Sequence, residues 1–179
     1  MPRHALLLTA CLALLTACST TSSDPRARSP GKVIDDQAIE WEVRRDIAAA
    51  DKGFESGNLT IVVYNGIMLL AGQVETDALK QLAEDRARSF ASIRTVHNEL
   101  EVMPPIAVVA RANDTWLTTK IKTQMLADGE LIAGKIKVVT VNNVVFLMGI
   151  LPREEGDRAV EIARQVYGVR KIVKVFEYL

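Results

Sequence analysis

The side chains best suited to nucleophilic or metal chemistry are scarce in this chain of 179 residues. Its two cysteines are Cys11 and Cys18, and its two histidines are His4 and His97. The part of the chain after Cys18 therefore has no thiol for a disulfide, for nucleophilic catalysis or for a cysteine-based metal site. His97 lies in a stretch with strand character and has no nucleophile motif beside it, so we interpret it as a strand histidine rather than a catalytic base.

Acidic and glycine residues do not form a catalytic motif either. Glu154 and Glu155 come at the start of a predicted helix, where carboxylates stabilise the positive end of the helix dipole. The glycines are scattered singly, so there is no phosphate-binding loop. Lys and Arg together number 22, as do Asp and Glu, so the chain has no overall basic field. We therefore predict a protein that is not an enzyme, needs no cofactor or metal ion and does not bind nucleic acid.

Cys18 lies in a setting that predicts covalent modification. A short basic start precedes an apolar run over residues 5–17, which is too short to cross a bilayer as a helix but fits the apolar region of a signal peptide. Residues 15–18, Leu-Thr-Ala-Cys, resemble the lipobox of bacterial lipoproteins, where small residues precede the cysteine that is lipidated. A second match ends at Cys11 but leaves a much shorter apolar run. We therefore predict a signal peptide over residues 1–17 and acylation of Cys18.

The segment that follows the cysteine has the composition of a linker. Residues 19–32 are rich in Ser, Thr, Pro and Arg, which predicts a flexible tether over residues 18–35. The alternative, a buried helix with two core cysteines before it, is disfavoured because the tether has no large apolar residue to pack beside such a helix. The resemblance to lipoproteins implies two or three acyl chains, which anchor a protein firmly. Ser19, where an Asp would imply inner-membrane retention, implies the periplasmic face of the outer membrane.

The rest of the chain contains one pattern twice, over residues 36–102 and 114–178. Each copy starts with apolar residues at helical spacing, followed by two β-branched runs that are separated by Asn-Gly or Asn-Asn, as in a tight hairpin. An Ala-rich helical pattern and a last short strand complete the copy. We predict an α+β fold with two αββαβ domains, each with a three-stranded mixed sheet packed on two helices.

Particular residues define the limits and interior of these domains. The Met-Pro-Pro at residues 103–105 interrupts the pattern, so we predict domains over 36–103 and 114–179 with a connection over 104–113. Asp36 and Asp114 occupy positions suited to helix N-caps. Ile121 and Val145 match apolar residues in the first copy and should be buried. Gly72 and Gly149 fall at corresponding sites and indicate a bulge or close packing.

These motifs together resemble a known family. The hairpin that ends in Gly-Gln-Val at residues 72–74 and the segment Ile-Arg-Thr-Val-His-Asn-Glu-Leu at residues 93–100 are typical of the BON domain. Residues 113–120 and 145–149 are more specifically similar to outer-membrane lipoproteins with two BON domains that bind lipid. The resemblance implies that the second domain binds anionic phospholipid, phosphatidylglycerol or cardiolipin. It also implies a role in envelope integrity and enrichment at the division site.

The two copies differ most in their first helix. In the first copy this helix is acidic, whereas residues 116–127 contain Lys120 and Lys122 and no acidic residue. Trp116 aligns with Ala38, so the shared fold does not need an aromatic side chain there. A Trp beside a Lys suits the bilayer interface, where the indole lies at headgroup depth and the ammonium group meets phosphate.

We predict four lipid-binding residues on this helix: Trp116, Leu117, Lys120 and Thr123. Three of them recur at i, i+4 and i+7, on a face rotated from the apolar stripe, and Leu117 lies at the edge of that stripe. If the helix starts at Asp114, Trp116 lies in its first turn, where free backbone amides and the helix dipole favour phosphate.

Two alternatives remain at the level of sequence. In the first, Trp116 packs against the neighbouring domain and the lysines are merely solvated. In the second, the protein is a periplasmic interaction module, for example for the outer-membrane barrel assembly machinery, with Trp116 as the interface anchor. Trp41, in the acidic helix of the first copy, is expected to pack against the protein.

Overall fold

The computed structural model describes residues 29–105 and 108–179. The predicted signal peptide, Cys11, Cys18 and most of the predicted tether lie outside these residues. Among the described residues, no helix combines the length and the apolar character needed to span a bilayer.

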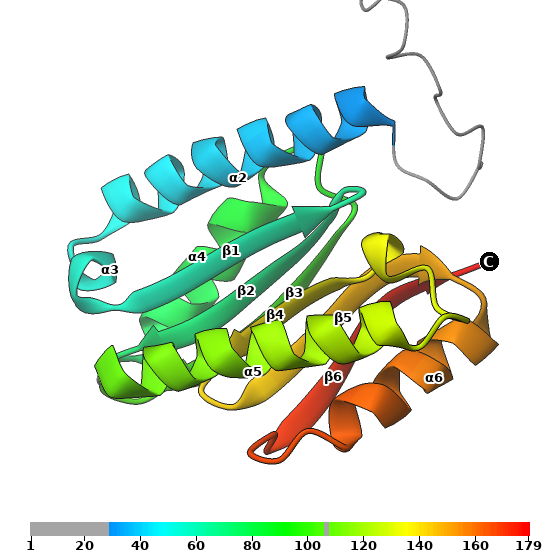
Figure 1. Ribbon diagram of the computed structural model, residues 1–179. Helices are drawn as coiled ribbons and strands as arrows, with labels where there is room; N and C mark the ends of the chain where they lie inside the picture. Colours follow the sequence, from blue (N-terminus) through cyan, green and yellow to red (C-terminus); the bar gives the residue numbers. More distant parts are fainter. Residues whose placement is uncertain (1–28, 106–107) are drawn as a thin grey trace, which may run out of the picture.

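Two domains with the same order of elements follow one another (Figure 1). The first consists of α2 (Pro30–Ala50), α3 (Gly53–Ser56), β1 (Asn58–Tyr64), β2 (Ile67–Val74), α4 (Asp77–Arg88) and β3 (Thr95–Val102). The second consists of α5 (Val108–Ala127), a short 3₁₀ helix (Ala133–Lys135), β4 (Lys137–Val141), β5 (Val144–Leu151), α6 (Arg153–Arg164) and β6 (Lys171–Tyr178).

Each domain has a three-stranded mixed sheet, which confirms the predicted fold. β1 and β2 form an antiparallel hairpin, and β3 joins β2 in parallel. β4, β5 and β6 repeat this arrangement. The hairpin turns have the positive φ angles that a two-residue turn of this kind requires, with 53° at Asn65 and 74° at Gly66. The second turn has 50° at Asn142 and 62° at Asn143.

The first helix of each domain begins earlier than predicted. Ser29 is the N-cap of α2, and its side chain accepts a hydrogen bond from the amide of Lys32. α5 likewise begins at Val108. The prediction that Asp36 and Asp114 cap these helices is therefore wrong. Residues 30–35 and 108–113, predicted as tether and connection, are helical.

Both aspartates instead hold the hairpin turns. They are buried inside their helices, with exposed fractions of 1% for Asp36 and 6% for Asp114. The amide of Asn65 donates to Asp36 Oδ2 at 2.8 Å. Those of Asn142 and Asn143 donate to Asp114 Oδ2 and Oδ1, both at 2.8 Å. A carboxylate suits this place because it accepts turn amides that the ladder leaves unpaired.

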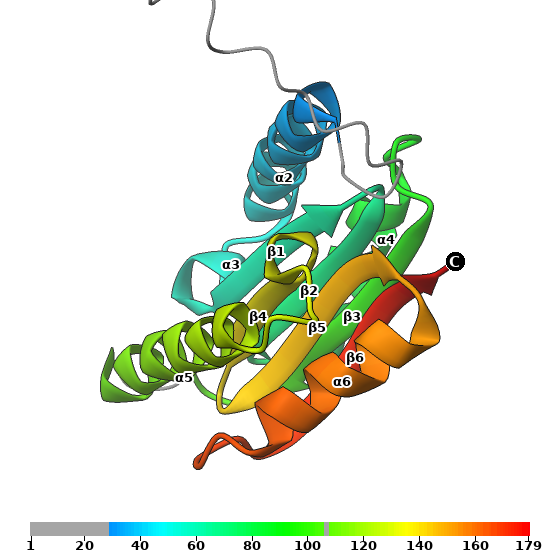
Figure 2. The same cartoon turned by 45° about the vertical axis from the view of Figure 1, so that its right-hand side comes forward.

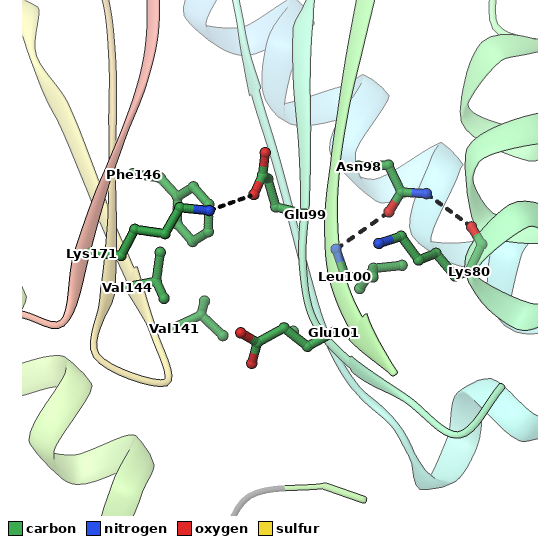
Figure 3. Close-up of a pocket in the computed structure, with 10 residues that line it drawn as sticks. Lys80, Asn98, Glu99, Leu100, Glu101, Val141, Val144, Phe146 and Lys171 are labelled. Atoms are coloured by element: carbon green, nitrogen blue, oxygen red, sulfur yellow. Dashed lines mark hydrogen bonds and ion pairs between the residues drawn. The ribbon is translucent and has the colours of Figure 1, made fainter. Parts of the chain in front are cut away.

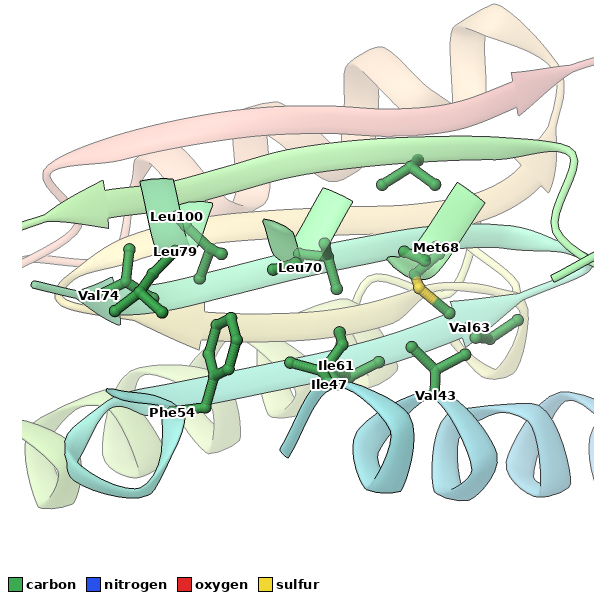
Figure 4. Packing of buried hydrophobic residues seen from close by; sticks show 13 residues of the cluster. Val43, Ile47, Phe54, Ile61, Val63, Met68, Leu70, Val74, Leu79 and Leu100 are labelled. Atoms are coloured by element: carbon green, nitrogen blue, oxygen red, sulfur yellow. The ribbon is translucent and has the colours of Figure 1, made fainter. Parts of the chain in front are cut away.

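Each sheet packs one face against its two long helices. In the first domain, Val43 and Ile47 of α2 lie over Ile61 and Met68 (Figure 4). The second domain repeats this core with Ile121 and Val145, both fully buried as predicted.

Gly72 confirms the predicted close packing. Its φ is 129°, and a Cβ there would lie 1.7 Å from the carbonyl oxygen of Asn58. A Cβ at Gly149 would lie 2.8 Å from the carbonyl oxygen of Lys135. Neither position has room for a side chain, because a strand or turn backbone passes directly over it.

The other faces of the two sheets pack against each other, with the helices on the outside (Figures 1 and 2). The Tyr64 hydroxyl crosses this interface and donates to the carbonyl oxygen of Lys135 at 2.7 Å. The interdomain cluster consists of Val62, Tyr64, Leu69, Ala71, Val141, Val144, Phe146, Met148 and Val175. The two domains thus form one four-layer α/β/β/α sandwich.

Polar contacts at the rim of this interface are reciprocal. Arg94 pairs with Glu177 at 2.8 Å, and the corresponding Arg170 of the second domain pairs with Glu101 at 2.8 Å. The side chains of the turn asparagines repeat the exchange: Asn65 Nδ2 donates to Glu177 at 3.0 Å and Asn142 Nδ2 donates to Glu101 at 2.9 Å. Equivalent residues therefore contact each other across an approximate two-fold axis, as in an isologous dimer interface.

Candidate functional site

The outer surface of α5 carries the residues predicted to bind lipid. Trp116 is 52% exposed, and Lys120 and Thr123 are exposed on the same face. The opposite face holds Leu117 and Ile121 in the core, which fixes the rotation of the helix. The structure therefore brings three of the four predicted residues together on one solvent-facing surface, which we call the α5 outer face.

Leu117 does not belong to the α5 outer face. It is fully buried in the second domain's core, so the prediction that it contacts lipid is wrong. The reason is helix geometry, because adjacent residues are about 100° apart around the axis. With Trp116 pointing outward, its neighbour turns towards the sheet.

The helix dipole also plays no part at Trp116. Because α5 begins at Val108, Trp116 lies in the third turn rather than the first. Its neighbours' amides are engaged within the helix, and the dipole charge is confined to the first and last turns. Any attraction of an anion to this surface therefore has to come from side chains, of which Lys120 is the nearest cation on the face.

Threonines make the α5 outer face less polar than its sequence indicates. The hydroxyl of Thr119 donates to the carbonyl oxygen of Thr115, and that of Thr123 donates to the carbonyl oxygen of Thr119, both at 2.9 Å. These hydroxyls turn back to the helix backbone. Further along, Leu126 is 73% exposed. The face thus carries an aromatic ring, a lysine and threonine hydroxyls that are hydrogen-bonded to the helix backbone.

The domain-packing alternative for Trp116 is not what the structure shows. Trp116 is 52% exposed, and the interdomain cluster consists of strand residues from the two sheets. The prediction that Trp41 packs against the protein is also wrong, because Trp41 is 68% exposed. It lies two residues before the buried Val43, about 200° around the helix, and so points away from the sheet.

Sequence reasoning passed over one exposed aromatic, Tyr167. It lies in the loop between α6 and β6 and is 94% exposed. The signal was available in the repeat, because Tyr167 aligns with Ala91 just as Trp116 aligns with Ala38. Both aromatics are additions of the second copy.

A cavity of about 180 Å³ lies between the domains, where β3 faces β5 and β6 (Figure 3). Its acidic residues engage cations of the second domain: Glu99 lies 3.8 Å from Lys171, and Glu101 pairs with Arg170. Asn98 donates to the carbonyl oxygen of Lys80 at 3.0 Å. The two ion pairs join the domains, the Asn98 hydrogen bond joins β3 to α4 within the first domain, and none of these contacts forms the nucleophile and base of a catalytic site.

Electrostatic perturbations are found at ion pairs that support the fold. The Arg94 guanidinium, hydrogen-bonded to Glu177, lowers the pKa of that carboxyl below its ordinary value, although partial burial opposes the shift. Hydrogen bonding from Arg158 lowers the pKa of Asp128 in the same way. Each of these carboxylates is paired with an arginine that supports the fold, so neither lowered pKa indicates a proton-transfer site.

The BON domain model matches residues 35–104 and 113–179. The chain is 36% identical over 158 residues to the outer membrane lipoprotein DolP of Haemophilus influenzae, which covers 88% of this chain and 81% of that protein. It is 36% identical over 160 residues to a 21 kDa hemolysin of Actinobacillus pleuropneumoniae, covering 89% and 81%. It is 29% identical over 152 residues to the osmotically-inducible protein Y of Escherichia coli K12, covering 83% and 75%.

None of these three names denotes an enzyme. The similarities confirm the predicted resemblance to lipoproteins with two BON domains and support an envelope protein associated with the outer membrane. Family models match both halves of the sandwich, and the relatives extend over most of the chain. The chain therefore belongs to the family of BON-domain proteins.

Proposed function

We propose that this protein binds anionic phospholipid through the α5 outer face, with Trp116 as the aromatic anchor and Lys120 as the cation for the headgroup. The observation that carries the proposal is the half-exposed Trp116 beside exposed Lys120 on a helix that the core holds in place. Thr123 lies on the same face with its hydroxyl bonded to the helix backbone. An aromatic ring and a flexible ammonium group side by side match the headgroup region of a bilayer.

The physical magnitudes indicate a contact that is weak alone and effective when tethered. One Lys near an anionic leaflet contributes about 1 kcal/mol, so the α5 outer face by itself gives modest affinity. An acyl anchor would hold the domain near the surface and raise its local concentration. We propose that Cys18, which lies outside the described residues, carries this anchor on the periplasmic face of the outer membrane. The lipid contact then supports envelope integrity and enriches the protein at the division site.

The copies themselves supply the control for the test. Trp41 is an exposed Trp on α2, the helix of the first domain that corresponds to α5, and there the residue aligned with Lys120 is Glu42. Trp116→Glu and Trp41→Glu can therefore be compared in unlipidated chain, made without its signal peptide and with Cys18→Ser. Each variant is mixed with vesicles of phosphatidylcholine, with and without phosphatidylglycerol or cardiolipin, and its thermal unfolding is recorded.

We expect Trp116→Glu to abolish sedimentation with anionic vesicles, and Trp41→Glu to bind like the parent chain. Both should unfold at the parent temperature, because both side chains are exposed and Ala38 occupies the Trp116 position in the first copy. A folded Trp116→Glu chain that still binds anionic vesicles would contradict the proposal. Binding that is insensitive to headgroup charge and salt would favour the protein-interaction alternative instead.

A further inference from the structure

Tyr167 is a highly exposed aromatic residue in a loop whose valines pack against the core. Its side chain is 94% exposed, compared with 52% for Trp116. The residues around it are fixed, since Val166 is buried and Val169 packs against the same core. Gly168 adopts a φ of 98°, which a glycine accepts without strain. The loop therefore presents the Tyr167 ring to solvent from a rigid base.

This loop borders α5 at the turn that carries Trp116. A Cβ at Gly168 would lie 3.5 Å from Cδ2 of Leu117, the residue that follows Trp116. The loop is also bonded to the β4–β5 turn, because the amide of Arg170 donates to the carbonyl oxygen of Asn143 at 2.9 Å. The loop that carries Tyr167 thus packs against the core side of α5, at the turn that carries Trp116 and at one end of the second domain.

Cationic side chains lie on α6 and β6, the two elements that flank the loop. A shallow pocket there has a lining that includes Arg164, Arg170, Lys171 and Lys174. Their carboxylate partners, in the same order, are Glu161, Glu101, Glu99 and Asp157. Arg164 and Lys174 pair within the second domain and are 65% and 46% exposed, and exposed pairs of this kind contribute little energy, so these two cations can exchange a carboxylate for a lipid phosphate.

We propose that Tyr167 is a second membrane anchor of this protein, which enters the headgroup region of an anionic bilayer beside Trp116. The inference rests on the proposed lipid binding by α5 and extends it to the α6–β6 loop. A Tyr ring places its apolar body against acyl chains and its hydroxyl among headgroups. The first domain, with Ala38 and Ala91 at the two corresponding positions, lacks both anchors.

The test compares three single variants of the unlipidated chain: Tyr167→Ala, Trp116→Ala and Trp41→Ala. Vesicles contain phosphatidylcholine with or without phosphatidylglycerol. Tyr167→Ala should bind the anionic vesicles about tenfold more weakly, which corresponds to about 1.4 kcal/mol and to roughly 55 Å² of ring returned to water. Trp41→Ala should bind like the parent chain. Thermal unfolding of Tyr167→Ala should be unchanged, because Ala91 occupies this position in the first copy.

A fluorescent reporter locates the contact directly. Tyr167→Trp in a chain with Trp41→Phe and Trp116→Tyr has one tryptophan. Sedimentation first establishes that this chain binds anionic vesicles, and its emission should then shift to shorter wavelength with anionic vesicles only. Normal binding by Tyr167→Ala together with an unshifted reporter overturns the inference, while a defect in Trp116→Ala leaves the proposed function standing. Loss of binding in Tyr167→Ala alone overturns the α5 proposal and keeps the loop as the anchor. A parent chain that does not bind anionic vesicles overturns both the α5 proposal and the Tyr167 proposal.

Discussion

Asp114 offers a sharp test of how the second domain is held together. Its carboxylate is 6% exposed within α5 and accepts the amides of Asn142 and Asn143, both at 2.8 Å. These two residues have φ angles of 50° and 62°, in the left-handed region. Asp114→Ala removes the acceptor of both hydrogen bonds and leaves the backbone amides of Asn142 and Asn143 to hydrogen-bond water.

The expected loss follows from those two bonds. A hydrogen bond to a charged group contributes about 1.5 kcal/mol or more, so losing both should lower the free energy of unfolding by about 3 kcal/mol. That is a large part of the 5–15 kcal/mol typical of whole proteins. The matched control is Asp157→Ala, whose carboxylate is 67% exposed and pairs with Lys174 at the surface. Removing such a pair should change stability by less than about 1 kcal/mol.

Two measurements check this prediction. Urea unfolding gives the loss of free energy for each variant, and amide hydrogen exchange reports the turn itself. Exchange at Asn142 and Asn143 should accelerate strongly in Asp114→Ala and remain unchanged in Asp157→Ala. A loss below about 0.5 kcal/mol, with both turn amides still protected, would refute the idea that the helix aspartate holds the hairpin.

The remaining predictions address the core, pH and the anchor. Ile121→Ala should cost about 2–5 kcal/mol, measured by urea unfolding, since this fully buried side chain leaves a cavity. Because Arg94 lowers the pKa of Glu177, that carboxylate adds stability above its ordinary pKa of 4.5, and the contribution is lost as the pH falls through the lower folded value. Glu177→Gln should therefore lower stability at neutral pH and flatten its decline below about pH 4.5, and an unchanged acid profile would contradict this. Cys18→Ala should abolish incorporation of labelled palmitate and remove the protein from the outer-membrane fraction; normal labelling would redirect attention to Cys11.

Local patterns predicted the elements and part of the site. The hairpins follow from Asn-Gly and Asn-Asn between β-branched runs, and the core face of α5 from Leu117 and Ile121 at helical spacing. That same spacing predicted that Trp116, Lys120 and Thr123 share an exposed face. The prediction that Leu117 contacts lipid was wrong, because a residue on the core face of a helix cannot also face solvent.

The predictions for Asp36, Asp114 and Trp41 were wrong because the role of each side chain depends on a contact or an orientation that was not considered. Asp36 and Asp114 have the side chain of an N-cap, yet their partners are turn amides about 30 residues further along the chain. A carboxylate bonds whichever free amides the fold brings to it. Trp41 was assigned by its acidic neighbours, although its spacing from Val43 placed it on the outer face.

The sequence by itself determined the repeat, the order of elements and the register of each hairpin, because turn chemistry and side-chain period act over a few residues. Only the tertiary structure decided that the sheets pack face to face. That arrangement depends on apolar residues on the second face of β2 and β5, such as Leu69 and Phe146, meeting across the chain. It also depends on the pairing of Arg94 with Glu177, 83 positions apart. Contacts between residues so far apart produce no periodic pattern in the sequence. The orientation of the domains can therefore be determined only from the folded structure.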